Sequence, residues 1–385
     1  MNFIIKTTTE CNFRCTYCSE GNQKPQNLPL PVFQKLVDEI PTLLSDKKEE
    51  LTILWHGGEP LLCGRERLDA AMTYAEEKLA GYNLHFSMQS NGYLLDHDET
   101  LKMLDKHHVR VGISLDGYQE NHDAVRQTKE GYSTWNQIIE NIKRLQEMDL
   151  FGGILMVYRG EEDPGKVFDF LEHTGIPCKI NPLLPFGRAA DQEKESQKKQ
   201  ENYVDFLIQL YKFSVQSDAK IIIDPIEKIL DAILGRSPIQ ECSFSGTCGK
   251  NILCLYADGK MGLCGRDSET REFIYGDLNS QSLLDIYHTE QAEKVRRRSQ
   301  YIREHDCGTC DIFQYCHGGC PYEALHSSGN LLQKFPYCNS RKRLIHFLET
   351  DGLLLLKQRL LREKRLVRRR ISVGQKLQEK LAYEG

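Results

Sequence analysis

The sequence lacks the features that mark membrane-spanning and secreted proteins. It contains no run of about 18 consecutive apolar residues, and Met1–Thr9 form a short strand-like run in place of a secretory signal. Neither sign of charge dominates, because 50 basic residues face 55 acidic ones and the net charge is −5. That balance argues against a general nucleic-acid-binding protein. No internal repeat or low-complexity segment is present, and we expect a cytoplasmic protein.

Cysteine, in contrast, is abundant, with 14 in a chain of 385 residues. Disulfides rarely persist in a reducing cytoplasm. We therefore expect most of these cysteines to bind metals or inorganic clusters.

Apolar runs of strand length alternate with helical patterns up to about residue 235. Six strand–helix pairs predict an α/β fold of parallel βα units, a partial (β/α)6 barrel like the TIM barrel. The chemistry of such barrels lies at the C-terminal ends of the strands. The expected strands are Phe3–Lys6, Leu51–Trp55, Leu84–Met88, Val109–Leu115, Ile154–Tyr158 and Lys179–Leu183, and the expected helices are Val32–Leu44, Leu68–Leu79, Leu101–His107, Trp135–Met148, Lys166–Thr174 and Tyr203–Phe213.

The alternation stops near residue 235, and cysteines become frequent from Cys242 to Cys338. We expect a barrel domain over 1–235, a loop-rich domain held by inorganic clusters over 236–345, and a basic helical tail over 346–385. The tail fits a solvated amphipathic helix, or alternatively a surface for an acidic peptide or an anionic membrane.

Cys11, Cys15 and Cys18 form a C-x3-C-x2-C triplet in the first βα loop. Three thiolates can hold three irons of a [4Fe–4S] cluster, which normally takes four cysteines. The open fourth iron can chelate the amino and carboxylate groups of S-adenosylmethionine, and reductive cleavage of that cofactor yields a 5′-deoxyadenosyl radical. A zinc site is the alternative, but zinc needs a fourth ligand, and none is close in sequence.

Further residues make the chain resemble the radical S-adenosylmethionine enzymes. Tyr17 matches the aromatic residue that packs near the adenine in that family. Gly57-Gly58-Glu59-Pro60 matches the GGEP motif, whose backbone and acid meet the cofactor's amino group, and Ser90-Asn91-Gly92 resembles the segment near the ribose. Ser114 and Arg126 correspond to cofactor contacts in the anaerobic sulfatase-maturing members, although Arg126 could equally be a charge on a helix surface.

The spacing of the C-terminal cysteines resembles that of the SPASM domain, which occurs in peptide-modifying and sulfatase-maturing members. The resemblance implies two further [4Fe–4S] clusters, three in all, with every iron of these two ligated by cysteine. Cys242 could replace Cys254 as a ligand, and two structural zinc sites are the alternative reading. The implied ligands are Cys248, Cys254, Cys264 and Cys320 for auxiliary cluster I, and Cys307, Cys310, Cys316 and Cys338 for auxiliary cluster II.

The resemblance implies an oxidative maturase of a ribosomally made peptide or protein. An anaerobic sulfatase maturase, which forms formylglycine from Ser or Cys, is the second hypothesis. Against it, that group places a general-base aspartate directly after the second SPASM cysteine, where this sequence has Gly265. A hypothesis of another class, a non-catalytic electron carrier, would not need Tyr17 or the GGEP motif.

The catalytic base is not fixed by the sequence, and Asp267, Asp224 and Glu227 are candidates. The expected partners are a peptide or protein substrate and a reducing donor of the flavodoxin or ferredoxin type. Because only ten residues precede Cys11, we expect a leader peptide to be bound by a separate protein or by the C-terminal region.

Overall fold

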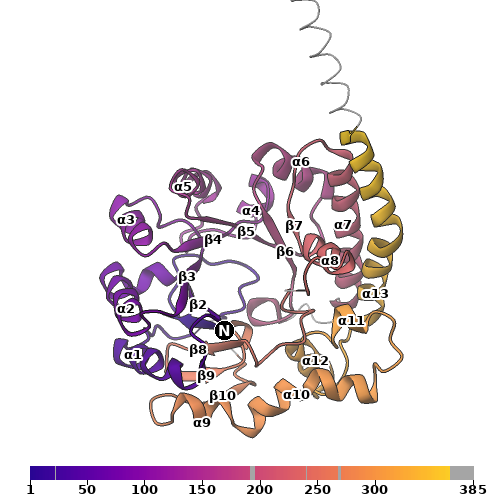
Figure 1. Cartoon of the computed structure of the whole chain (residues 1–385). Coiled ribbons are helices and arrows are strands. Elements are labelled where there is room, and N and C mark those ends of the chain that lie inside the picture. Colours follow the sequence, from indigo (N-terminus) through magenta and orange to yellow (C-terminus); the bar gives the residue numbers. More distant parts are fainter. Residues whose placement is uncertain (22, 191–195, 240, 268–269, 365–385) are drawn as a thin grey trace, which may run out of the picture.

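The computed structural model describes residues 1–364, except 22, 191–195, 240 and 268–269. Ten strands form one sheet in the order β10-β9-β8-β1-β2-β3-β4-β5-β6-β7 (Figure 1). The strands are β1 (Asn2–Lys6), β2 (Glu50–His56), β3 (Asn83–Ser90), β4 (Arg110–Ser114), β5 (Phe151–Tyr158), β6 (Cys178–Pro182), β7 (Ile223–Asp224), β8 (Ile252–Leu255), β9 (Lys260–Gly262) and β10 (Ile274–Asp277).

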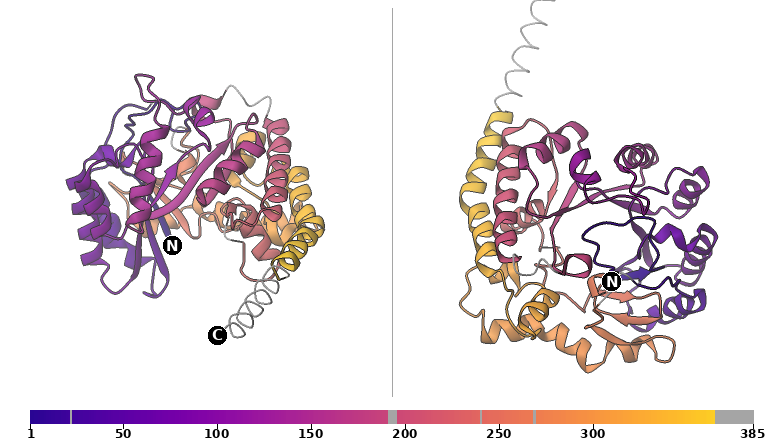
Figure 2. Two further views of the ribbon diagram at one scale, coloured as in Figure 1. Left: turned by 90° about the horizontal axis from the view of Figure 1, so that it is seen from above. Right: turned by 180° about the vertical axis from the view of Figure 1, so that it is seen from behind.

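Strands β1 to β7 are parallel and follow one another in chain order, which confirms the predicted partial barrel of βα units. Along β2, β3 and β5 buried side chains alternate with partly exposed ones, so one face of these strands is more deeply buried than the other. Helices surround the strands on the outside (Figures 1 and 2). They are α1 (Leu30–Glu39), α2 (Arg65–Lys78), α3 (Asp98–Lys106), α4 (Gln119–Asp123), α5 (Trp135–Glu147), α6 (Pro164–Thr174), α7 (Ser196–Gln216) and α8 (Ile226–Ile233).

The C-terminal region is joined to the barrel through the same sheet. Strand β8 pairs in parallel with β1, placing Cys254 opposite Ile4, and β9 and β10 continue antiparallel from β8. Lys35 of α1 also donates hydrogen bonds to the carbonyls of Leu278 and Gln281. The remaining helices are α9 (Leu283–Tyr287), α10 (Glu290–His305), α11 (Phe313–Cys316), α12 (Pro321–Ser328) and α13 (Cys338–Phe347), which is followed by a π-helical turn, Leu348–Gly352.

The described part of the tail is helical and lies along α7 (Figure 1). Arg359 donates to the carbonyls of Ser214 and Ala219, at 3.0 and 3.1 Å, and Arg362 donates to that of Val215. These two charges therefore stabilise the C-terminal end of α7, where unpaired carbonyls carry negative partial charge. The remaining arginines of the basic run, from 365 onward, lie outside the described residues. Among the described helices, none is both long and apolar enough to cross a membrane.

Candidate active site

The glycine pair after β2 lies against the residues that lead into Cys11. Gly58 N donates to the carbonyl of Thr8 at 2.8 Å, and Glu59 N donates to that of Glu10 at 2.7 Å. A methyl group on Gly58 would lie 2.2 Å from the Glu10 oxygen, and one on Gly57 would lie 2.4 Å from the Thr8 oxygen. Glycine is thus required here for close approach of two backbone segments at the barrel mouth.

The Glu59 carboxylate connects the ends of β2 and β3. It accepts hydrogen bonds from the Ser90 hydroxyl at 2.9 Å, Asn91 N at 2.8 Å and Leu61 N at 3.3 Å. Burial raises its pKa to about 7. The Asn91 side chain in turn reaches Cys11 Sγ at 3.9 Å. The GGEP acid therefore holds the segment after β3 against the cysteine loop, a role that the resemblance alone did not suggest.

The three N-terminal cysteines lie together in the loop after β1. Burial raises the pKa of the Cys11 thiol to about 12 and that of Cys15 to about 11, so iron must displace the protons when a cluster assembles. The loop after β6 holds this segment from the other side, since Arg188 donates to the carbonyls of Cys15 and Cys18, both at 3.0 Å. A methyl group on Gly187 would lie 2.2 Å from the Cys18 oxygen. Sequence reasoning missed this pair, although Gly187-Arg188 follows the sixth expected strand.

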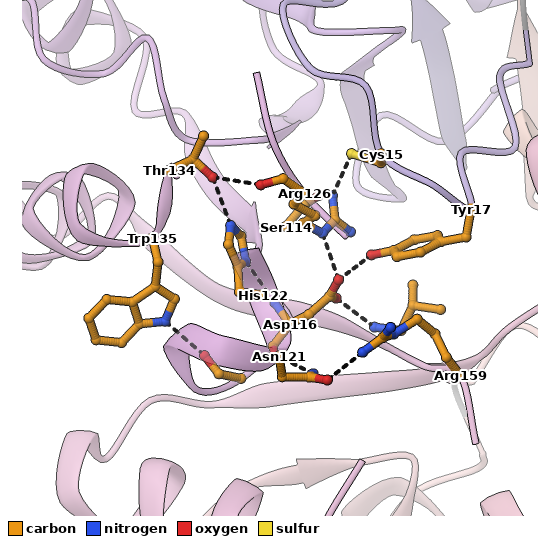
Figure 3. A network of polar contacts seen from close by, with 12 residues as sticks. Cys15, Tyr17, Ser114, Asp116, Asn121, His122, Arg126, Thr134, Trp135 and Arg159 are labelled. Atoms are coloured by element: carbon orange, nitrogen blue, oxygen red, sulfur yellow. Dashed lines mark hydrogen bonds and ion pairs between the residues drawn. The ribbon is translucent and has the colours of Figure 1, made fainter. Parts of the chain in front are cut away.

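Asp116, after β4, is the centre of a buried polar network beside Cys15 (Figure 3). One carboxylate oxygen accepts from Arg126 Nε at 3.0 Å and from the Tyr17 hydroxyl, and the other accepts from Val157 N at 3.0 Å. Arg126 Nη1 lies 3.8 Å from Cys15 Sγ. Arg126 is 7% exposed, so the interpretation as a helix-surface charge is wrong. Sequence reasoning placed Asp116 in a motif loop but gave it no role.

His122 fixes the orientation of this network. Asp116 N donates to its Nδ1 at 3.2 Å, so the proton of the neutral ring is on Nε2, which lies 3.0 Å from the Thr134 hydroxyl. That hydroxyl donates to the Arg126 carbonyl at 3.0 Å. Burial lowers the pKa of His122 to about 4, which keeps the ring neutral. Ser114, expected at the cofactor, accepts a hydrogen bond from the Gln89 amide at 2.9 Å.

The C-terminal cysteines fall into two electrostatic groups. Burial and then the thiols of Cys320, Cys242 and Cys264 raise the pKa of Cys248. Burial and then Cys338, Cys310 and Cys316 raise the pKa of Cys307 to about 11. Cys242, and not Cys254, is among the main electrostatic partners of Cys248.

Cys254 has different surroundings. It is fully buried in β8 and pairs with Ile4 of β1. Burial raises its pKa, the charge of Lys6 acts against that effect, and Cys264 is the one other cysteine among its main electrostatic partners. The arrangement therefore favours Cys242 as the companion of Cys248, Cys264 and Cys320.

Zinc and iron–sulfur clusters make different demands on a set of cysteines. Zinc needs four ligands at about 2.0–2.3 Å from one centre. Among the residues that the structure describes, no three Cys, His, Asp or Glu side chains converge closely enough to hold a single metal ion. The cysteine sets are nevertheless mutual electrostatic neighbours, as the corners of a larger inorganic core require. The three sets thus fit [4Fe–4S] clusters.

Arg298 holds the loop between α11 and α12, which connects Cys316 to Cys320. Its buried guanidinium donates to the carbonyls of Gly318, Gly319, Leu331 and Gln333, at up to 3.0 Å. This single side chain therefore shapes the loop between Cys316 and Cys320.

The structure gives the base candidates unequal surroundings. Asp224 forms an ion pair with Lys228 at 2.8 Å. Glu227 lies in the first turn of α8, and burial followed by the charges of Asp231 and Asp224 raises its pKa. The side chain of Asp267 lies outside the described residues. At Gly265 a methyl group would lie 3.0 Å from Lys6 Cε, and Lys6 is ion-paired with Glu20.

Comparisons with known proteins agree with this geometry. Residues 5–171 match the model of the radical SAM superfamily, and residues 242–311 match the SPASM iron–sulfur cluster-binding domain. The cysteine-type anaerobic sulfatase-maturating enzyme of Clostridium perfringens strain ATCC 13124 is 23% identical over 361 residues, which cover 90% of this chain and 96% of that protein.

Solved structures share the fold. The structure described as native anSMEcpe with bound AdoMet and Cp18Cys peptide has a TM-score of 0.77 at 21% identity. The match covers 93% of this chain and 98% of that one. Streptococcus suis SuiB bound to its precursor peptide SuiA has a TM-score of 0.62 at 15% identity, over 87% of this chain and 74% of that one.

A parallel βα barrel whose first loop carries three cysteines, joined to a cysteine-rich C-terminal region, defines an iron–sulfur enzyme. The chain belongs to the radical S-adenosylmethionine superfamily and carries a SPASM domain. Its cofactors are S-adenosylmethionine and [4Fe–4S] clusters. The prediction of an enzyme, in preference to an electron carrier, is confirmed.

Proposed function

We propose that this enzyme oxidises a side chain of a ribosomally made peptide or protein. The observation that carries the proposal is the presence of two cysteine sets of four beside a barrel whose first loop bears three. When bound, the cofactor and its cluster supply a radical that removes a hydrogen atom from the substrate. The additional clusters suit an oxidation, because a substrate radical must lose one more electron to give a closed-shell product.

We propose three ligand sets for these clusters. The first is Cys11, Cys15 and Cys18, and the set for auxiliary cluster II is Cys307, Cys310, Cys316 and Cys338. For auxiliary cluster I we propose Cys242, Cys248, Cys264 and Cys320, with Cys254 as a buried strand residue. Tyr17, Asp116 and Arg126 would position the first set, and Glu59 and Asn91 would hold the loops on which the cofactor rests.

Formation of formylglycine is the second candidate. It is supported by the similarity to sulfatase-maturating enzymes and by a neighbouring structure with a bound peptide. Gly265 counts against it. An aspartate at this position would lie against the Lys6 ammonium, which is already paired with Glu20. It would therefore contact Lys6 and not a substrate.

The test uses the reconstituted enzyme, S-adenosylmethionine and reduced flavodoxin under anaerobic conditions. Formation of 5′-deoxyadenosine is expected, and its absence would overturn the radical assignment.

Two peptide sets are then compared by mass spectrometry: sulfatase-motif peptides with Cys or Ser, and short peptides encoded beside the gene. An aldehyde on the first set supports the second candidate. A new cross-link or oxidation confined to the second set supports the peptide maturase and calls for a search for a leader-binding protein. Modification of neither set, with cofactor cleavage intact, contradicts both.

A further inference from the structure

Each of the three proposed cluster sites has one arginine directed at a cysteine sulfur. Arg126 Nη1 lies 3.8 Å from Cys15 Sγ, and Arg266 Nη1 lies 3.9 Å from Cys320 Sγ. Arg341 Nη1 makes the shortest of the three contacts, 3.4 Å from Cys316 Sγ. Hydrogen bonds and charges at ligand sulfurs are among the main determinants of a cluster's reduction potential.

The charge of Arg126 is offset within its own site. Its Nε lies 3.0 Å from the Asp116 carboxylate, which is fully buried with it. A cation paired with an anion at this distance has a weak field at its neighbours. Arg126 therefore orients Cys15 without adding a net charge next to the N-terminal cysteines.

Arg341 differs because its charge has no such partner. Its neighbours on α13, Lys342 and Arg343, pair with Asp311 and Asp205 at 2.9 and 2.8 Å, whereas no acidic side chain in the described part of the chain forms an ion pair with Arg341. The other hydrogen bond of Arg341 Nη1 goes to the Ser243 carbonyl at 2.8 Å.

Aromatic rings hold the Arg341 guanidinium in place. Its central carbon lies 4.0 Å from the ring centre of Phe244 and 3.7 Å from that of Phe335, and the residue is 7% exposed. Contact with aromatic rings fixes a guanidinium and excludes water from the surface that the rings cover. Poor access of water means that its charge is screened less than that of a surface arginine.

Glu323 is a buried acid of the same region, but among the described residues it forms no ion pair with Arg341. It lines a pocket that Arg341 and Arg266 also line. Arg266 interacts with Glu323 more strongly than Arg341 does and also acts on Glu241, and its contact with sulfur is longer, at 3.9 Å. Of the three arginines, Arg341 is thus the one whose charge acts most directly on a cluster ligand.

We propose that Arg341 raises the reduction potential of auxiliary cluster II and thereby makes it the acceptor for the electron left on the substrate. The cation stabilises the reduced cluster, which carries one more negative charge than the oxidised one. In the step that this serves, the substrate radical gives one electron to the cluster, which passes from the 2+ to the 1+ state, and releases one proton to solvent. Arg341 keeps its own proton and acts as a positioning residue. The assignment rests on the proposed ligand set and function.

The test is an anaerobic redox titration of the reconstituted full-length enzyme, followed by electron paramagnetic resonance, without substrate. In Arg341→Gln we expect about a tenfold fall in the equilibrium constant for one-electron reduction of auxiliary cluster II, or about 59 mV, with the other two clusters unchanged. The matched control is Arg343→Gln, two residues away on the same helix, which should leave all three potentials at their wild-type values. Unchanged potentials in a fully loaded Arg341→Gln enzyme would overturn the proposal.

A second variant keeps the proposal testable if Arg341→Gln loses its cluster. Arg341→Lys keeps the charge but cannot hold the same forked geometry between the rings, so we expect a smaller shift in the same direction. If Arg341→Gln loses iron and Arg341→Lys has the wild-type potential, Arg341 is a structural residue only and the proposal is wrong. Because no peptide enters these titrations, failure of the proposed substrate class would leave their result unaffected.

Discussion

Single buried polar residues at the barrel mouth each hold two or more chain segments. Asp116 joins the loops after β1 and β4 to strand β5, through Tyr17, Arg126 and Val157 N. Glu59 joins the ends of β2 and β3. Removing one member of such a network leaves the others buried without partners, which costs more than the net value of the bond itself.

His122 gives this network a measurable pH dependence. Its pKa falls from 6.5 to about 4 on folding, so between these values the unfolded chain binds a proton that the folded chain does not. Stability from His122 is therefore complete above pH 6.5 and is lost as the pH falls toward 4, by about 1.4 kcal/mol per pH unit. In His122→Gln we expect the acid slope of unfolding free energy, measured by urea titration, to be shallower by about that amount.

The control for this prediction is His97→Gln, because the His97 side chain is 74% exposed. It should leave the slope as in the wild type. Equal slopes for His122→Gln and the wild type would contradict the prediction, because they would mean that His122 binds a proton as readily in the folded protein as in the unfolded chain.

Cys242 and Cys254 are a matched pair for testing auxiliary cluster I. In Cys242→Ala we expect a loss of about four of about twelve irons per chain, one cube of three, because Cys242 is grouped with Cys248 and Cys320. Cys254→Ala should keep the full iron content, since Cys254 lies within a strand against β1. Iron and sulfide analysis of both variants decides the matter, and the reverse pattern would restore Cys254 as the ligand.

The sequence showed where the functional residues lie along the chain more readily than what each of them contacts. The motif residues were located because they follow apolar strands, but their partners lie far along the chain. Arg188 reaches the Cys15 carbonyl across 173 positions, and Lys6 meets Glu20 and the space beside Gly265. The resemblance placed Cys254 among the ligands and left Cys242 as a replacement, because spacing does not show which of the two faces Cys248.

At the scale of elements, the expected strands and helices agree with the structure to within a few residues, except that α7 begins at Ser196, seven residues before the expected Tyr203. The apolar runs and helical periodicities are strong for buried βα units, so β1 to β6 and their helices were predictable. The pairing of β8 with β1 was not, because β8 lies among cysteine-rich loops and its partner is about 250 residues away. Local patterns contain no signal for such a pairing.

The contact between the tail and α7 leads to a prediction at this scale. Arg359 and Arg362 bond the last carbonyls of α7, so their joint replacement by Ala should lower stability by about 1–2 kcal/mol. Hydrogen exchange measured by mass spectrometry should show faster exchange confined to the C-terminal turn of α7. Lys357→Ala, which removes an exposed charge from the same helix, is the control. Equal exchange in the double variant and the control would mean that these arginines are free for another partner.

For the whole molecule, the three cysteine sets predict independent cluster occupancy. Replacement of Cys11, Cys15 and Cys18 by Ala should abolish cleavage of S-adenosylmethionine and leave about eight of about twelve irons, two cubes of three. The reason is that the C-terminal sets have four thiols each and need none from the barrel. Cys63→Ala should retain all the iron and full cleavage. Persisting cleavage in the triple variant would contradict the assignment of the radical site.

The parallel pairing of β1 with β8 has a consequence for the order of events during synthesis. The first strand leaves the ribosome long before the strand that covers its outer edge, and some 250 residues separate the two. Until residue 255 has emerged, one row of backbone groups on β1, directly before the cysteine loop, has no partner in the sheet. Unpaired edges of this kind recruit other chains, so a nascent or truncated barrel that ends near residue 235 should aggregate, and iron is best inserted into a chain that has already been completed.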